Sequence, residues 1–398
     1  MGVAVFKSDF GEQAPVDAVY HDGRSGLEMH NLYQLLYNRA VFELTERRFG
    51  RGLTWGRSGY AGSQRYPVQW GGDSYSSLDQ MASQLRGLLS YGLSGVPFCS
   101  HDVGGFDYAP GYFDQVTDED YLKSYAEASK DGYPKDPVVY ARWLQFCVFS
   151  SHVRAHGKQP HEPWTYGAEV EAIARRYLKL RYRLLPYVYS EAVASTCTAL
   201  PMARPLALAF QSDPNTRSLD LQYLFGGSIL VAPVFRHDGR CRVYLPAGDW
   251  VDFWTKTVVT GPTWLDLTAP LDTLPLWVRG GAIIPLGPEQ DFVDQKPLDP
   301  LTIELYAPGR EGHYTIYDED RPEIEIAYWR SALEGEGGTR GNLEELRIAI
   351  GPTPGQAELI WYGVQVRSAQ VNGAVAPIVS GSSIRFDGRR GSSIVLTL

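Results

Sequence analysis

The chain lacks features that several broad classes of protein require. No apolar run approaches the roughly 20 residues of a membrane-spanning helix, and no charged segment followed by an apolar one opens the chain, so neither membrane association nor a signal peptide is expected. A net charge of −9 argues against nucleic acid as a partner. Cysteine is scarce and no Cys-x-x-Cys pair occurs, which favours free thiols and a cytoplasmic location; the four are Cys99, Cys147, Cys197 and Cys241.

Other absences narrow the chemistry. No Gly-x-Ser-x-Gly occurs, which argues against the nucleophile elbow of an α/β-hydrolase. No internal repeat or low-complexity tract is present, and we expect neither a cofactor nor a metal. Aromatic residues, in contrast, are plentiful at 13%, with 25 tyrosines and 10 tryptophans. Flat rings stack on the apolar faces of sugars, although they also fill protein cores.

The most unusual stretch runs from Arg57 to Asp73, opening on a cation and closing on a carboxylate. Gly71 and Gly72 precede Asp73, so the backbone can turn sharply and present that carboxyl group. Trp70 offers an apolar wall, which disfavours a carboxylate anion and lets the group hold a proton near neutral pH, as a general acid must. The alternative is a glycine-rich turn whose Asp caps the next helix.

Short apolar runs alternate with helical patterns over the first half of the chain. Polar residues follow the apolar runs, which is typical of the parallel βα sheets and barrels that keep their chemistry at the strand ends. The stretch that begins at Ser77 resembles a capping box, and the apolar stripe behind it indicates core packing. A polar passage over 107–137 is interpreted as an excursion over the barrel mouth. The predicted strands are 3–6, 53–55, 66–70, 96–100 and 201–206, and the predicted helices are about 29–40, 78–89, 138–153 and 168–194, the last kinked at Pro186.

After about residue 212 the helical stripes end and short alternating runs take over, which predicts an all-β region. A Pro- and Gly-rich passage over 285–300 divides it into two β units. The predicted fold class is therefore α/β plus all-β. We expect a catalytic domain over 1–211, a proximal β-sandwich over 212–290 and a distal β-sandwich over 291–398.

Five motifs, in order and at plausible spacing, resemble the carboxyl-terminal portion of glycoside hydrolase family 31, and in particular its α-xylosidases. The resemblance runs from residue 2 to about 290, and more loosely to the end. The motifs are Lys7-Ser8-Asp9-Phe10-Gly11-Glu12, Trp70-Gly71-Gly72-Asp73, Ser100-His101-Asp102-Val103-Gly104-Gly105-Phe106, Arg154-Ala155-His156-Gly157 and Leu230-Val231-Ala232-Pro233-Val234.

The resemblance implies a (β/α)₈ barrel, two β-sandwich domains and a retaining mechanism. Asp9 matches the nucleophile and Asp73 the acid/base, while His101 is assigned to structural support. Lys7 replaces an apolar residue of many α-glucosidases and resembles the α-xylosidases, whose pocket receives a pentose. The remaining matches to the sugar pocket are Arg57, Trp70, Asp102, Phe106 and His156.

Elementary chemistry agrees with that assignment. Retention needs two carboxyl groups about 5–5.5 Å apart, one ionised to attack the anomeric carbon and the other protonated for the leaving oxygen. Asp9 lies near Lys7 in sequence, and Arg57 is expected at an adjacent strand end, so cations would favour ionised Asp9. We therefore expect a double-displacement α-xylosidase that hydrolyses terminal α-xylosyl residues of an oligosaccharide or α-xyloside. The alternatives are an α-glucosidase of the same family and a noncatalytic carbohydrate-binding fragment.

The chain departs from the family pattern at its front. Family members carry an N-terminal β-sandwich and three barrel strands before the nucleophile strand, so this chain is expected to hold barrel strands four to eight only. An open arc of strands favours association, either as a homo-oligomer or with a complementing N-terminal fragment. A truncated reading frame or fragment is the favoured explanation, ahead of a split enzyme or an inactive chain, and little or no activity is expected from the isolated chain.

Overall fold

The computed structural model describes residues 3, 5–66, 68–107, 136–158, 160–334 and 340–398. The chain forms two compact units. The first comprises residues 1–172, 195–205 and 235–237, and the second comprises 173–194, 206–234 and 238–398. Most of the predicted excursion, residues 108–135, lies outside the described residues, and the three predicted domain ranges stay predictions.

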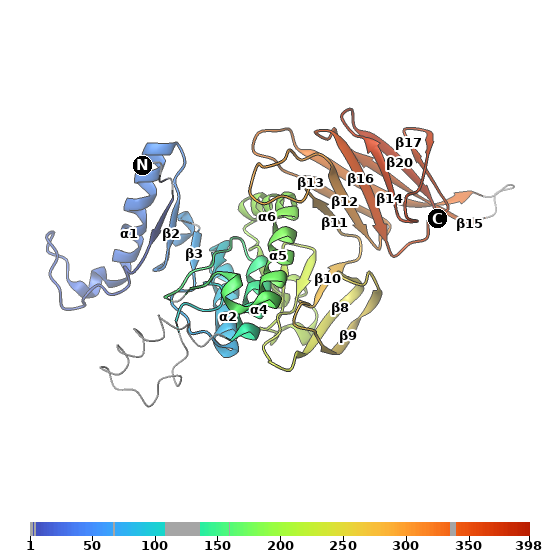
Figure 1. The fold of residues 1–398 in the computed structure, drawn as a ribbon. Coiled ribbons are helices and arrows are strands. Elements are labelled where there is room, and N and C mark those ends of the chain that lie inside the picture. Colours follow the sequence, from blue (N-terminus) through green and yellow to red (C-terminus); the bar gives the residue numbers. More distant parts are fainter. Residues whose placement is uncertain (1–2, 4, 67, 108–135, 159, 335–339) are drawn as a thin grey trace. The chain divides into compact units, whose positions relative to one another are not determined.

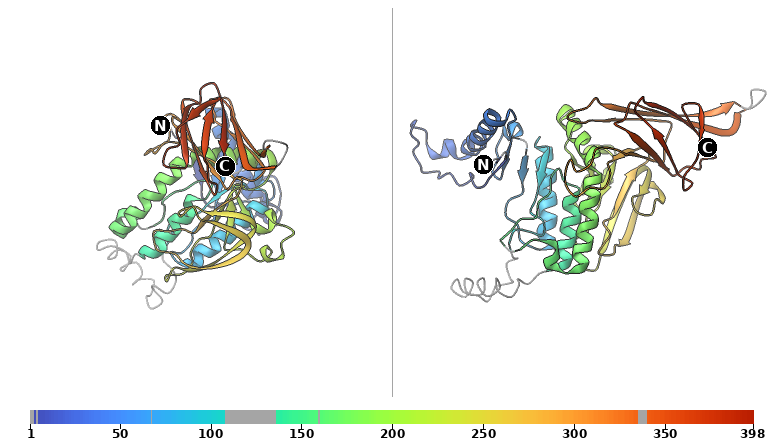
Figure 2. Two further views of the ribbon diagram at one scale, coloured as in Figure 1. Left: turned by 90° about the vertical axis from the view of Figure 1, so that its right-hand side faces the viewer. Right: turned by 45° about the horizontal axis from the view of Figure 1, so that its top comes forward.

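A parallel sheet of four short strands organises the first unit, and its strands follow one another in chain order. Figure 1 labels β2 and β3 of this sheet. The helices α2 and α4 pack side by side, and α2 also contacts β4 (Figures 1 and 2). The elements are β1 (Phe6–Ser8), α1 (Gly26–Phe49), β2 (Thr54–Gly56), η1 (Ser63–Arg65), β3 (Val68–Trp70), α2 (Leu78–Leu93), β4 (Phe98–Ser100), α4 (Pro137–Val148), η2 (Pro163–Tyr166) and β5 (Ala203–Pro205).

The predicted first strand over residues 3–6 is wrong in its position. Pairing with β2 begins at Phe6 and continues through Lys7 and Ser8, whereas Val3 and Val5 are 50% and 45% exposed. An apolar composition indicated a buried strand, but the register of the pairing decides which residues belong to it. Asp9 therefore follows the last paired residue directly.

The helices begin and end where capping chemistry places them. Ser25 opens α1 with a full capping box to Glu28, and Gly50 closes it in the left-handed region. The Ser77 hydroxyl caps α2 by accepting from the Gln80 amide at 3.2 Å, and the predicted apolar stripe behind it is buried. Helix α4 ends at Val148, five residues before the predicted end.

Helix α1 does not bury a purely apolar stripe. Met29 is buried, but Leu36 is 37% exposed. The buried face instead includes Asn38 and Thr45, which are fully buried. The Asn38 amide donates to the Ser58 carbonyl at 2.7 Å, so polar bonds to the loops around β2 hold this helix against the sheet.

The long helix predicted over 168–194 is two helices, α5 (Ala168–Arg183) and α6 (Leu185–Thr198). The break falls at Leu184, two residues before Pro186. Because proline has no amide hydrogen and its ring clashes with the preceding turn, the predicted interruption is confirmed.

A sheet of antiparallel strands follows in the second unit, with β6, β7, β10, β8 and β9 neighbouring one another in that order. A small buried cluster that includes Leu230, Val243 and Trp250 lies at this sheet. The elements are α7 (Leu206–Ala209), η3 (Pro214–Thr216), β6 (Tyr223–Phe225), β7 (Ile229–Val231), β8 (Arg240–Asp252), β9 (Val258–Thr268) and β10 (Leu276–Arg279).

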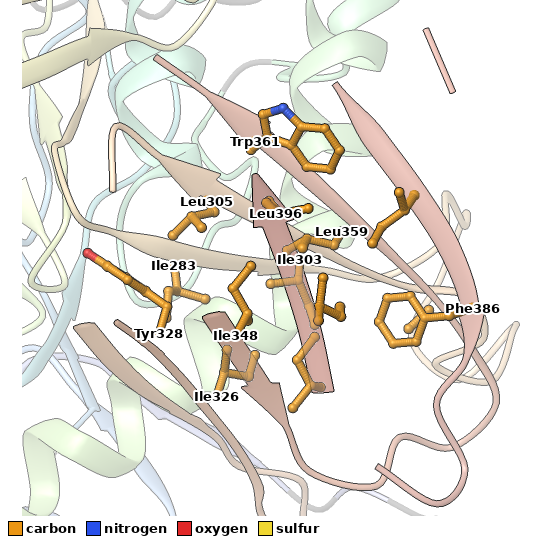
Figure 3. Packing of buried hydrophobic residues seen from close by; sticks show 14 of the residues in the cluster. Ile283, Ile303, Leu305, Ile326, Tyr328, Ile348, Leu359, Trp361, Phe386 and Leu396 are labelled. Carbon is orange, nitrogen blue, oxygen red and sulfur yellow. The ribbon is translucent and has the colours of Figure 1, made fainter. Parts of the chain in front are cut away.

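Two further sheets close the chain as a sandwich, one of β11-β12-β16-β19 and one of β13-β14-β15-β20-β17-β18. Apolar side chains from both sheets, among them Ile303, Ile348 and Leu396, gather between them (Figure 3). The strands are β11 (Ile283–Leu286), β12 (Leu301–Tyr306), β13 (Glu311–Ile316), β14 (Ile324–Glu334), β15 (Arg340–Ile350), β16 (Gln356–Tyr362), β17 (Ser368–Val371), β18 (Ala374–Ala376), β19 (Ser383–Asp387) and β20 (Ser392–Thr397).

The passage from the β6–β10 sheet to the sandwich is short. Strand β10 ends at Arg279 and β11 begins the sandwich at Ile283, so residues 280–282 make the connection. The predicted divider over 285–300 corresponds instead to the end of β11 and its link to β12. All four cysteines are free thiols. None of the helices in the described ranges is both long and apolar enough to cross a membrane.

Candidate active site

Asp9 follows β1 directly, and the turn after it has a fixed shape. Phe10 has a φ of 59° and Gly11 a φ of 98°, and the Tyr37 hydroxyl donates to the Asp9 carbonyl at 2.8 Å. A Cβ atom at position 11 would lie 2.6 Å from Ser58 Oγ and 2.9 Å from Tyr37 Cδ1, so only glycine fits. These constraints fix the backbone that carries the Asp9 carboxyl group, whose side chain is 47% exposed.

Arg57, just after β2, brings three carboxylates together. Its Nη1 lies 2.9 Å from Asp9 Oδ1 and 3.6 Å from Asp73 Oδ2, while its Nη2 lies 2.6 Å from Glu12 Oε1. Because one nitrogen contacts both aspartates, Asp9 Oδ1 and Asp73 Oδ2 are separated by at most the sum of 2.9 Å and 3.6 Å, about 6.5 Å. The two predicted catalytic carboxyl groups thus face one shared space.

The turn that delivers Asp73 depends on two glycines after β3. Gly72 has a φ of 75°, and a Cβ at Gly71 would lie 1.8 Å from the Gln84 amide oxygen. The sharp turn inferred from this glycine pair is therefore present. The Asp73 side chain is 47% exposed, so the apolar surroundings predicted from Trp70 enclose it only in part.

Trp70 itself is fully buried and carries two cations on its ring. Lys7 Nζ lies 4.2 Å from the ring centroid and the Arg154 guanidinium carbon lies 5.1 Å from it. The same guanidinium lies 4.6 Å from the ring centroid of Trp55. Cation–π attraction between these groups fixes the side chains on the same side of β1, β2 and β3.

Asp102 and Arg154 form an ion pair, and a parallel β-bridge joins their backbones. The Asp102 side chain is fully buried, and this burial raises the pKa of its carboxyl group to about 6, against the opposing effects of Arg154 and Lys7. Among the described residues no donor reaches Asp102 Oδ2. A buried acceptor without a donor is costly, so a ligand hydroxyl or a water molecule would stabilise it.

His156 lies against Phe106, with ring centroids 5.5 Å apart. Burial, together with the nearby charges of Arg154 and Lys7, lowers the pKa of His156 to about 4. Burial and Arg154 also lower the pKa of Lys7. His156 is therefore a neutral imidazole near pH 7, with one nitrogen able to donate a hydrogen bond and the other able to accept one.

His101 has different surroundings from the residues above. Its ring is fully buried and stacks on Phe146 with centroids 4.1 Å apart. The Trp143 indole donates to His101 Nδ1 at 3.2 Å, and Cys147 Sγ lies 2.9 Å from the same nitrogen. These buried contacts support the structural role that was expected for His101.

Arg154 and Trp55 belong to this cluster, although neither was among the predicted site residues. A cation two residues before His156, in a motif already singled out, was the available signal for Arg154. The ring of Trp55 gave no comparable signal, because its place in the cluster depends on the direction in which its side chain leaves β2.

The expectation of no metal assumed that no His-x-x-x-His spacing occurs, which is wrong, because His152 and His156 have this spacing of some zinc motifs. Their segment is not helical, and the His152 ring packs edge-on against Trp55 with centroids 4.5 Å apart. Of the residues that the structure describes, no group of three or more His, Cys, Asp or Glu could hold a metal ion.

Comparison with known proteins yields matches along most of the chain. A 36% identical α-xylosidase of Emericella nidulans matches over 76% of this chain and 37% of its own length. The α-glucosidase 2 of Bacillus thermoamyloliquefaciens is 31% identical over 79% of this chain and 38% of its own. The structure of a Flavobacterium johnsoniae dextranase complexed with glucose superposes with a TM-score of 0.83 and 28% identity, covering 100% of this chain and 53% of that one.

The chain thus spans between a third and two fifths of the length of these curated relatives. Two family models match it directly. The glycosyl hydrolases family 31 TIM-barrel domain matches residues 1–191, and the glycosyl hydrolase family 31 C-terminal domain matches residues 199–284. Both belong to one family and they follow in order, so the chain is a member of glycoside hydrolase family 31.

Proposed function

We propose that this chain carries the catalytic pair of a retaining α-glycosidase, with Asp9 as the nucleophile and Asp73 as the acid/base. The observation that carries the proposal is the contact of both carboxylates with the same Arg57 nitrogen, at 2.9 Å and 3.6 Å. The resulting bound of about 6.5 Å between the two oxygens accommodates the 5–5.5 Å of retaining enzymes and only touches the lower end of the inverting range.

In the first step, Asp9 attacks the anomeric carbon and forms a covalent bond to it. The bond between that carbon and the leaving oxygen breaks, and Asp73 transfers its proton to that oxygen. Arg57 lies nearer to Asp9 than to Asp73, which suits Asp9 as the anion and Asp73 as the proton donor.

In the second step, a water molecule attacks the anomeric carbon and gives its proton to Asp73. The bond from the sugar to Asp9 then breaks, which regenerates both carboxyl groups and releases a sugar of retained configuration. Arg57, Asp102 and His156 provide hydrogen bonds to the sugar hydroxyls and Phe106 provides apolar surface, while the fully buried Trp70 acts through its ring contact with Lys7.

The substrate that we propose is a terminal α-xylosyl residue. Lys7 Nζ lies 4.2 Å from the ring centroid of Trp70. The Lys7 side chain therefore occupies space at the proposed sugar site, which favours a pentose without a hydroxymethyl group. The similarity to the α-xylosidase of Emericella nidulans supports this choice. The α-glucosidase among the relatives supports α-glucosides as the second candidate.

A mechanism-based 2-fluoro-α-xyloside tests the proposal directly. Peptide mass spectrometry should find the label on Asp9 and no label in Asp9→Ala. Labelling at another carboxyl group would contradict the assignment of the nucleophile. Absence of any label, together with xylose binding that Arg57→Ala weakens, would favour the noncatalytic carbohydrate-binding alternative.

Initial rates on aryl α-xyloside and aryl α-glucoside then separate the two substrate classes. We expect little turnover of either by the isolated chain, with the xyloside faster. Robust turnover that Asp9→Ala abolishes would contradict the expectation of low activity but support the catalytic pair. A faster rate on the glucoside would favour the α-glucosidase.

We propose further that β1 to β4 are consecutive strands of a (β/α)₈ barrel and that the segment at Arg154 continues it. The parallel bridge between Asp102 and Arg154 supports this order, whereas β5 lies outside the four-stranded sheet.

β1 is an edge strand with Phe6 39% exposed, which supports association with a second copy or with a complementing segment. Sedimentation velocity over a range of concentrations would test association. The free thiols support a cytoplasmic location.

A further inference from the structure

A cavity lies wholly within the second unit, apart from the residues around Asp9 and Asp73. Its volume is about 540 Å³, within the range of small-molecule sites. Three segments form its walls: the end of α5 with the start of α6, the connection between β11 and β12, and the turn between β13 and β14. We refer to it as the sandwich groove. Its lining includes Tyr182, Tyr189, Tyr317, Val293, Asp294 and Arg321.

The connection between β11 and β12 is tied to α5, so this wall of the groove is preformed. The Gly287 amide donates to the Arg183 carbonyl at 2.8 Å. Lys179 Nζ lies 2.8 Å from an Asp291 carboxylate oxygen and 3.3 Å from one of Glu289. The Gln290 side chain, 8% exposed, accepts from the backbone of the same connection.

The opposite wall is tied to α6. The Tyr317 amide donates to the Ser190 hydroxyl at 3.0 Å, and the Asp320 amide donates to the Asp318 carboxylate at 3.1 Å. A groove whose walls are fixed in advance loses little conformational freedom when a ligand enters it.

The lining combines flat rings with polar groups of both signs. Tyr189 is 43% exposed and Val293 is 56% exposed, so apolar surface is open to a ligand. Carboxylates such as Asp294 can accept hydrogen bonds, and Arg321 can donate them. The lining has four carboxylates and two cations, so it disfavours a polyanion, and a polycation is the competing ligand.

We propose that the sandwich groove binds a neutral saccharide. A sugar ring presents an apolar face for a ring such as that of Tyr189, and its hydroxyl groups both donate and accept hydrogen bonds. Asp294 and Arg321 at the rim supply the complementary groups. The proposal does not depend on the catalytic pair, because the groove contains none of its residues.

The proposal is tested by titrating the full chain with isomaltotriose and with D-xylose. Saturation-transfer NMR and calorimetry measure the binding. We expect Tyr189→Ala to weaken binding at least tenfold and Tyr189→Phe to change it less than twofold, since the ring remains. The matched control is Phe292→Ala, which removes a 58% exposed ring from the same connection outside the groove lining. That control should bind as the unaltered chain does.

The Asp9→Ala/Asp73→Ala double variant separates the two sites, and it should keep its binding to the groove. Loss of all binding in that variant would overturn the proposal, as would unchanged binding in Tyr189→Ala or no saccharide binding to the unaltered chain. Binding of spermidine or inorganic phosphate in place of the sugars would overturn it too. If Tyr189→Ala fails to fold by circular dichroism, Asp294→Ala takes its place, with an expected loss of at least threefold.

Discussion

The four-stranded sheet of the first unit and the sandwich of the second differ in what their interiors contain. Each strand from β1 to β4 has three residues, and the buried residues of these strands include the polar Thr54, Gln69 and Ser100. The sandwich has strands of up to 11 residues, and its core contains fully buried residues such as Leu301 and Leu396. The sandwich is built for stability, whereas the sheet positions polar groups at a cost in stability.

Arg154→Met should produce the largest loss of stability, about 3–5 kcal/mol at pH 8, because it leaves the buried Asp102 carboxylate without its partner. The loss should shrink at pH 5, where Asp102 takes up a proton, since its pKa is about 6 even with the arginine present. Urea unfolding at both pH values measures the effect. Arg154→Lys, which keeps the charge, is the control, and an equal loss at both pH values would contradict the explanation.

Leu359→Ala should cost the sandwich about 2–5 kcal/mol of unfolding free energy, because it leaves a cavity in a close-packed core. Leu359 is 1% exposed and lies in the same cluster as Trp361, so tryptophan fluorescence during denaturation follows this region. Val375→Ala, at a position 83% exposed, should change stability by less than about 0.5 kcal/mol. Equal effects of the two substitutions would show that the sandwich core is not close-packed.

His101 makes the first unit sensitive to acid in a way that the sandwich core is not. Burial lowers its pKa from 6.5 to about 3. The unfolded chain therefore binds a proton that the folded chain does not, so stability falls as the pH drops from 6.5 towards 3. The pKa of His156, lowered to about 4, acts in the same direction, whereas that of Asp102, raised from 3.8 to about 6, acts in the opposite one.

His101→Gln should reduce by about one the number of protons taken up on unfolding. The slope of the unfolding free energy against pH should therefore fall by about 1.4 kcal/mol per pH unit. Urea midpoints measured at intervals from about pH 4 to about pH 6, within the window that the shifted pKa opens, give the slope. His313→Gln, at a position with a 61% exposed side chain, serves as the control. An unchanged slope in His101→Gln would mean that this histidine is accessible to protons in the folded state.

Arg385→Ala should have the smallest effect, below about 0.5 kcal/mol. Its side chain is 71% exposed and lies 3.3 Å from Glu358 on the surface of the sandwich. Solvent and salt screen such a pair. Chemical denaturation in low and high salt measures the effect, and a loss above about 1 kcal/mol would show that surface pairs matter more here than the difference between the two interiors suggests.

Local sequence features predicted the order of elements in the first unit well. The Ser77 cap and the break near Pro186 follow from backbone chemistry that acts over a few residues. The position of β1 did not follow, because the pairing of Phe6 to Ser8 with β2 depends on residues far away in the chain. The apolar residues Val3 and Val5 suggested a strand, but the pairing with β2 does not include them.

The candidate site was predictable as far as its residues lie in recognisable motifs. The meeting of Asp9, Asp73 and Arg57 follows from strand ends on one edge of a parallel sheet, which sequence rhythm indicates. The ring contacts of Arg154 with Trp55 and Trp70 depend on side-chain directions across three strands. No spacing in the sequence encodes those directions, so the motif that contains Arg154 marked the residue without showing which rings it contacts.

Arg57 has one further consequence for a reacting sugar. Its single positive charge is shared among Asp9, Glu12 and Asp73, so these four side chains carry a net formal charge of −1 when Asp73 holds its proton. An electrostatic well of this kind stabilises a centre that becomes cationic as its bond to oxygen lengthens, and it is already in place before the substrate arrives. A protonated iminosugar should therefore bind here more tightly than its neutral counterpart.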